Sequence, residues 1–213
     1  MAATRESRFF YIGGVLCLDF VNTEPVQGGA RVNLLGGFGD LVEWLEAADV
    51  LTVEAARRAE RWSRLPEGAA VFRQAMRLRE TLRDAAERLA AGKPVSNVTV
   101  RAVNRILASR PVYAQLTREG KGFRTRIEPL SNAALHLLVP VAESAAWLLE
   151  HGERSLVRHC EGPDCVLFFY DTTKNKSRRW CSMDGCGSRA KAVAYYRRKR
   201  AGRGIASGLH PSQ

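Results

Sequence analysis

The sequence lacks long hydrophobic runs, and this absence excludes most membrane proteins. The apolar segment 9–20 is short and contains Asp19, and the segment 133–149 is interrupted by a histidine, a proline and a glutamate. A helix that spans a membrane needs about 20 mainly apolar residues, and a secretory signal ends in a small-residue cleavage site that segment 9–20 does not supply. We therefore expect a cytoplasmic protein without membrane contact.

Motifs that identify common enzymes are also missing. The four histidines are scattered, and the sequence contains neither an H-E-x-x-H motif nor a nucleophile elbow. The glycines near Gly36 lack the Lys-Ser/Thr pair that a phosphate-binding loop requires. Cys17 lies in an apolar run without an identifiable partner base, which favours a buried free thiol over a nucleophile. We predict that the protein is not an enzyme.

Acidic residues are few relative to basic ones. The 213 residues include 33 Lys/Arg and 22 Asp/Glu, which gives a net charge of +11. Residues 151–213 carry +8 of this excess, whereas residues 1–150 carry only +3. The imbalance predicts a polyanionic partner, and its position predicts that the C-terminal part of the chain makes the contact.

Only five cysteines are present, but four of them form a regular pattern. Cys160 and Cys165, followed by Cys181 and Cys186, make two C-x4-C pairs with a spacer of hairpin length between them. Two thiol pairs from two tight turns supply the tetrahedral ligand set of Zn²⁺. Because four thiolates leave no open coordination position, we predict a structural zinc ion rather than a catalytic one. Iron in the same site and a site without metal are the alternatives.

Basic residues crowd the same region and indicate a nucleic-acid surface. They are Lys174, Lys176, Arg178, Arg179, Arg189, Lys191, Arg197, Arg198, Lys199 and Arg200. Such clusters neutralise phosphates, and nearby Trp180, Tyr195 and Tyr196 are able to stack on bases or sugars. In the alternative interpretation, the Arg/Lys run only complements the C-terminal end of a helix, and Trp180 packs over the metal site. Nothing in these residues distinguishes DNA from RNA.

The pattern of apolar residues predicts a mainly α protein with a few short β strands, in the α+β class. Val15–Thr23 has the composition of a buried strand, and the segments 112–117 and 122–128 are predicted to form a hairpin. Helices are expected over residues 41–48, 53–64, 68–91, 97–109 and 132–150. Asp40 and Thr52 are the expected caps of the first two, and Ser96 or Asn97 is expected to start the fourth. The Arg-rich helices of this region alternate with Glu and Asp, which favours solvated faces.

These elements divide the chain into three predicted parts. Residues 1–152 form a helical body, residues 153–201 form a small ββα treble-clef-like four-cysteine zinc finger, and residues 202–213 form a flexible tail. The finger is expected to contain a strand over 166–170 and a helix from Cys186. One face of that helix, which carries Ala190, Val193 and Ala194, is expected to pack on the strands.

Two polar residues interrupt the predicted N-terminal strand. Asp19 and Asn22, together with Arg31, are candidates for a small-molecule pocket whose effector would reposition the finger. The competing interpretation is structural, with Asp19 and Asn22 hydrogen-bonded to the glycine-rich loop that follows. In both interpretations Arg31 is expected to pair with Asp19.

The cysteine region resembles a known family. The pairs Cys160-x4-Cys165 and 181–186, the run 178–183 (RRWCSM) and the run 186–189 (CGSR) are similar to the CGNR-type zinc finger, with Ser188 in place of the signature asparagine. The run 18–23 (LDFVNT) resembles the opening motif of the ABATE domain, which usually precedes this finger.

The resemblance implies a bacterial transcription regulator that binds DNA through the finger. An RNA-binding protein and a protein-interaction module with a purely structural zinc finger are the alternatives. A homodimer is compatible with the two half-sites that many regulators read.

Overall fold

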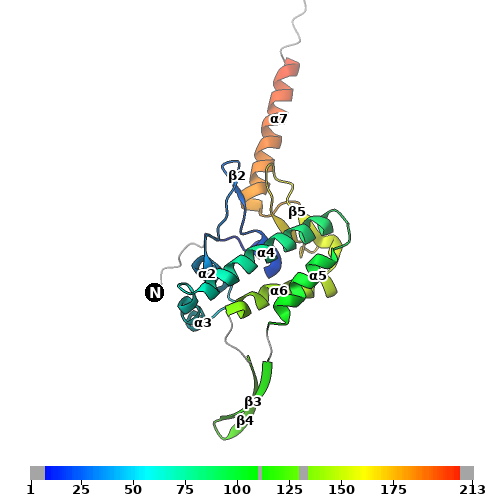
Figure 1. Ribbon diagram of the computed structural model, residues 1–213. Helices are drawn as coiled ribbons and strands as arrows, with labels where there is room; N and C mark the ends of the chain where they lie inside the picture. The colour runs from blue at the N-terminus through cyan, green and yellow to red at the C-terminus, as the bar shows by residue number, and fades with distance from the viewer. Residues whose placement is uncertain (1–7, 110–111, 130–133, 207–213) are drawn as a thin grey trace, which may run out of the picture.

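The computed structural model describes residues 8–109, 112–129 and 134–206 and is mainly helical (Figure 1). The helices are α1 (Leu16–Val21), α2 (Phe38–Ala47), α3 (Val53–Ala59), α4 (Pro66–Ala90), α5 (Asn97–Leu107), α6 (Val139–Glu150) and α7 (Ser188–Ala206). The strands form three antiparallel pairs: β1 (Val26–Gln27) with β2 (Ala30–Arg31), β3 (Val112–Glu119) with β4 (Gly122–Pro129), and β5 (Val157–His159) with β6 (Phe168–Tyr170). The predicted fold class is therefore confirmed.

Helix ends follow the predicted caps in two cases. The hydroxyl of Thr52 accepts the Ala55 N–H at the start of α3, and that of Ser96 accepts the Thr99 N–H at the start of α5. The prediction for α2 is wrong by three residues, because α2 begins at Phe38 and Asp40 lies inside its first turn. The predicted helix over 132–150 is a 3₁₀ turn, η2 (Ala134–Leu138), followed by α6; its first residues lie outside the described part of the chain.

Helix α1 lies at the centre of the body, where a strand over 15–23 was predicted. That prediction is wrong: residues 16–21 form a helix, and Asn22 is its C-cap. Phe20 and Val21 are completely buried, because α4, α6 and β6 surround this helix. Periodicity does not distinguish a short buried helix from a buried strand, since a helix enclosed on all sides has no polar face.

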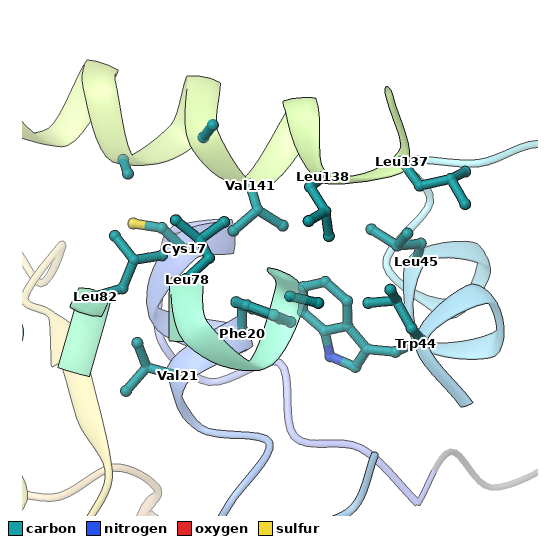
Figure 2. Close-up of a cluster of buried hydrophobic side chains, with 14 of the residues drawn as sticks. Cys17, Phe20, Val21, Trp44, Leu45, Leu78, Leu82, Leu137, Leu138 and Val141 are labelled. Atoms are coloured by element: carbon teal, nitrogen blue, oxygen red, sulfur yellow. The ribbon is translucent and has the colours of Figure 1, made fainter. Parts of the chain in front are cut away.

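The core of the body is formed where α1 meets its neighbours. Figure 2 shows Phe20 of α1 beside Trp44 of α2, with Val141 of α6 above Phe20 in this view. Leu78 of α4 belongs to the same cluster. The rings of Phe20 and Trp44 lie 5.2 Å apart, a distance typical of favourable aromatic pairs. Cys17 is buried in the same core, as predicted, and burial raises the pKa of its thiol to about 11, so the thiol stays neutral.

The finger strands are built into this core. β5 and β6 pair in the register Val157↔Tyr170, and the Tyr170 N–H donates to the Gly13 carbonyl of the N-terminal segment at 2.7 Å. Val157 and Phe168 are 2% exposed and belong to the hydrophobic core of the body. A second, smaller core lies around the cysteines. The body and the finger strands therefore form one packed unit.

Two elements project from this unit, at opposite ends in Figure 1. The β3–β4 hairpin extends from one end, and its described side chains are nearly all exposed, including Leu116 and Phe123. Helix α7 extends from the other end, and every side chain described from Lys191 to Lys199 is exposed. Among the described residues, no helix is both long and apolar enough to cross a membrane.

Candidate metal centre and nucleic-acid interface

The structure brings the four predicted metal ligands together. The Sγ atoms of Cys160, Cys165, Cys181 and Cys186 all lie within 4.8 Å of one another. The two separations given by close sulfur contacts are 3.8 Å for Cys165–Cys181 and 3.6 Å for Cys181–Cys186. A tetrahedral ion with Zn–S bonds of 2.3 Å places its sulfurs about 3.8 Å apart. The donor set and its spacing therefore fit a four-thiolate zinc ion.

Two turns and a helix start hold the sulfurs in place. Cys160 follows β5, and the turn after it returns the chain at Cys165. Cys186 lies in η4 (Met183–Gly187), a single π turn that leads directly into α7. The Ser182 hydroxyl accepts the Gly185 N–H at the start of this turn. The metal centre thus fixes the position at which α7 begins.

Several N–H groups donate to the sulfurs. The backbone N–H groups of Cys181 and Gly162 lie 3.2 Å and 3.4 Å from the Cys160 sulfur. The guanidinium of Arg189 donates to the Cys186 sulfur at 3.1 Å. Donors to the charged form stabilise it, so these contacts favour thiolates over thiols. Arg189 also places a positive charge next to a site whose four thiolates exceed the charge of a divalent ion.

Gly162 leaves room for the cluster. A Cβ at this position would lie 2.7 Å from the Cys186 sulfur and 3.4 Å from the Cys160 sulfur. The first distance is shorter than real Cβ contacts allow, so a side chain at residue 162 would push a ligand away. Only glycine fits the turn between the first two cysteines without displacing the sulfurs.

The sulfurs need a positive charge among them to ionise together. Interaction with Cys160 raises the pKa of Cys165 to about 12 and raises that of Cys181 even further. Hydrogen bonds from Cys165 and Cys181 lower the pKa of Cys160. Without a cation the cluster therefore supports one thiolate and resists a second, because like charges this close repel. A bound dication would offset much of this repulsion.

Asp171 organises the basic turn between the cysteine pairs. Its carboxylate is completely buried and accepts hydrogen bonds from the N–H and hydroxyl of Thr173 and from the Arg178 N–H. Although burial alone would raise the pKa of Asp171, these bonds and the charge of Arg158 lower it, so the group stays ionised. Sequence reasoning missed this residue; the spacing Asp171–Thr173 is that of an Asx turn and was the available signal.

Arg178 occupies a different place from the predicted nucleic-acid surface. Its guanidinium donates to the carbonyls of Ile12, Trp180 and Cys181, and it lies 4.2 Å from the centre of the Phe169 ring. These contacts point the side chain inward and join the N-terminal segment to the finger. The residue is therefore a structural cross-link, which its position in a basic run did not reveal.

The other predicted basic residues face outward to different degrees. Arg179 pairs with Glu161, and its Nε–Oε2 separation is 2.6 Å. Lys176 contacts the Asp171 carbonyl through its ammonium group, whereas Lys174 is simply exposed. The side chains that α7 exposes without a described acidic partner are Lys191, Arg197, Arg198 and Lys199. The side chain of Arg200 lies outside the described part of the structure.

The aromatic residues of the finger separate into two groups. Trp180 is partly buried against the small core around the cysteines, as the alternative interpretation proposed. Tyr195 and Tyr196 are exposed on α7, where their rings meet edge to face at 5.5 Å. Val193 is also exposed, so the predicted packing of this helix face on the strands does not extend past Ala190.

Asn22 joins the body to the finger. Its amide nitrogen donates to the Phe168 carbonyl at 2.8 Å, and its amide oxygen accepts the Phe168 N–H at 2.9 Å. The side chain is 1% exposed and acts as a strand partner for β6. This residue was a candidate for a ligand pocket, but both of its hydrogen-bonding ends are occupied by backbone.

Asp19 and Arg31 do not pair with each other as expected. The Asp19 carboxylate accepts the Gly13 N–H at 2.6 Å, upstream of α1 rather than in the glycine loop, and burial raises its pKa to about 6. Arg31 lies 3.4 Å from Glu24, which also pairs with buried Arg83. The three candidate pocket residues therefore point to three different places.

Comparison with family models agrees with this architecture. The model of the ABATE family, described as "Putative stress-induced transcription regulator", matches residues 14–152. The model of the CGNR zinc finger matches residues 157–199, which include all four cysteines. A comparison with curated proteins found no match.

Proposed function

Because the chain belongs to the ABATE family and carries a CGNR zinc finger, we propose that it is a transcription regulator that binds DNA through α7. The observation that carries this proposal is the exposure of α7. Its charged residues are all Lys or Arg, and no side chain described from Lys191 to Lys199 is buried. Because the described side chains from Lys191 to Lys199 are all exposed, this part of the 19-residue helix gains little stability from tertiary packing.

Duplex DNA matches this helix in both shape and charge. The major groove of B-DNA admits an α-helix, and a helix of this length extends about 28 Å. Lysine and arginine side chains along it would neutralise phosphates and release condensed counterions. The exposed rings of Tyr195 and Tyr196 offer apolar contact to sugars or base edges within the same surface.

We propose that the ion in the finger is Zn²⁺ and that its role is structural. When bound, zinc would offset part of the negative charge of the four thiolates and cross-link the two turns that lead into α7. Ser188, which stands where the family signature has asparagine, donates its hydroxyl to the Met183 carbonyl at 3.0 Å. It therefore supports the start of α7, and the base contacts in this proposal come from residues farther along the helix.

The proposal can be tested by fluorescence anisotropy with zinc-loaded protein, random duplex DNA and structured RNA at two salt concentrations. The variant Arg197→Ala/Arg198→Ala should weaken DNA binding about tenfold or more and reduce the salt dependence, because two phosphate contacts are lost. The matched control, Arg57→Ala/Arg64→Ala, removes the same charge from exposed positions on the body and should change binding little.

Three results would count against the proposal. Equal binding by the two double variants would show that net charge, rather than α7, attracts the DNA. A clear preference for RNA would move the assignment to an RNA-binding protein. Absence of binding to both polymers at low salt would favour a protein partner for the exposed helix.

A further inference from the structure

A groove between α4 and α5 has the features of a second binding site, far along the chain from the cysteines. The groove has a volume of about 440 Å³. Arg77 of α4 lies on one wall, and Arg101 and Arg105 of α5 lie on the other. Leu78, Val98 and Ile106 provide apolar surface within it. Its size falls in the range of known small-molecule sites, about 300 to 1,000 Å³.

The charge of this groove is of one sign. Its charged lining residues are all arginine, although the helices that form it also carry acidic residues elsewhere. Within the described part of the chain, none of the three arginines forms an ion pair. By contrast, Arg88 on α4 pairs with Asp84 at 2.9 Å. The expected alternation of charges on a solvated face therefore does not hold here.

The arrangement of these arginines suits several anionic groups at once. Arg101 and Arg105 are one turn apart on α5, so their side chains rise from the same face about 6 Å apart. Arg77 faces them from α4 across the groove. A guanidinium binds phosphate through two parallel N–H groups, and three guanidinium groups match a chain of phosphates better than a single anion.

The apolar surface on the floor of the groove adds a second requirement for the ligand. Val98 is 56% exposed and supplies most of the open apolar surface, whereas Leu78 and Ile106 also line the groove but are each only 3% exposed. An apolar or aromatic part of a ligand would bury this surface, which inorganic phosphate alone cannot do. We propose that the groove binds a small molecule with two or more linked phosphates on an aromatic body, which is the chemistry of a nucleoside polyphosphate.

This site can be tested with ATP, inorganic tripolyphosphate and adenosine as probes, by isothermal titration calorimetry of the zinc-loaded full chain at low salt. ATP should bind, tripolyphosphate should bind more weakly because it leaves the floor exposed, and adenosine should not bind measurably. The variant Arg101→Ala/Arg105→Ala should weaken ATP binding at least about tenfold, since two charge-assisted contacts are lost.

Two control variants make the result specific. Arg57→Ala/Arg64→Ala removes equal charge from the body outside the groove, and Arg197→Ala/Arg198→Ala alters α7; both should retain ATP binding. If the α7 variant alone lost ATP binding, the nucleotide would be occupying the DNA surface and the groove assignment would be overturned. Unchanged ATP binding in the groove variant, or no ATP binding by the unaltered protein, would also overturn it. Equal affinity for ATP and tripolyphosphate would overturn the role of the apolar floor.

Discussion

At the scale of single residues, partners far apart in the sequence hold the molecule together. Asn22 contacts Phe168, and Arg178 contacts Ile12, across most of the length of the chain. Each side chain reaches backbone atoms, so its partner could be any residue type. The sequence shows that Asn22 interrupts an apolar run and that Arg178 belongs to a basic run. It does not show which backbone groups they meet, because that depends on the tertiary fold.

Asn22→Ala should reduce the free energy of unfolding by about 2 to 4 kcal/mol, because it leaves the buried N–H and carbonyl of Phe168 without partners. Asn104→Ala on the exposed face of α5 serves as the control and should change stability by less than about 0.5 kcal/mol. Urea unfolding of both variants measures the difference. Similar stabilities would mean that water or another group replaces the Asn22 amide.

Asp19 should make stability depend on pH in an unusual direction. Its pKa is about 6 in the folded protein, above the ordinary value of 3.8, because burial disfavours the carboxylate. The folded state therefore binds this proton more tightly than the unfolded state, and its contribution to stability is lost as pH rises through 6. Between pH 5.5 and 7.5 the contribution should fall by about 1 kcal/mol.

The measurement is the unfolding free energy of the unaltered protein and of Asp19→Asn at both pH values, with zinc content verified. The difference between the two proteins isolates Asp19 from the other titrating groups. A difference that stays constant across the interval would show that Asp19 remains ionised throughout.

At the scale of elements, the predictable parts were those with strong local signals. The helix predicted over 68–91 lies at Pro66–Ala90, and the starts of α3 and α5 were predicted well because Thr52 and Ser96 cap them. The predicted end of the helix over 53–64 is wrong, because α3 ends at Ala59 and a 3₁₀ turn over Glu60–Trp62 follows it. The cysteine spacing likewise identified ligands that the fold brings together. Helix α1 was mistaken for a strand because it has only six residues, and the five apolar ones carry no period that distinguishes a helix from a strand.

The turn between the first two cysteines offers a sharp test of the metal centre. Gly162→Ala should weaken zinc binding at least about tenfold, because the new Cβ would displace the Cys186 sulfur. Gly185→Ala is a matched control, since a Cβ there meets only the Ser182 side chain at ordinary distances, 3.7 Å and beyond. Competition with a chromophoric chelator gives both affinities. Equal losses in the two variants would indicate a general effect of substituting glycine in this region.

At the scale of the whole molecule, the boundary between body and finger is clear in the sequence but not in the packing. Val157 and Phe168 lie in the finger segment and fill the core of the body. The composition of each segment suggested two units, because shared burial between segments leaves no mark in either one. By contrast, α7 shares little buried surface with the rest of the molecule among its described side chains.

Truncated chains should reveal this difference in packing between the finger strands and α7. A chain that ends at residue 152 should lose its cooperative thermal transition or melt at a much lower temperature, because the body core loses Val157 and Phe168. A chain that ends at residue 187 keeps the finger strands and all four cysteines and should melt close to the full-length protein. Calorimetry of the two zinc-loaded fragments compares them directly. A stable fragment 1–152 would contradict the shared core.

The described side chains of α7 from Lys191 to Lys199 are all exposed, so the turn at the start of the helix sets its direction. The helix would tilt about the π turn that contains Cys186, and its far end lies about 28 Å from this turn. A tilt of about 10° at this turn would move the far end of the helix by roughly 5 Å. This displacement exceeds the spacing of about 3.4 Å between neighbouring base pairs along B-DNA. In the proposed DNA complex, a small adjustment around the sulfurs would therefore be enough to change which bases the basic end of the helix reaches.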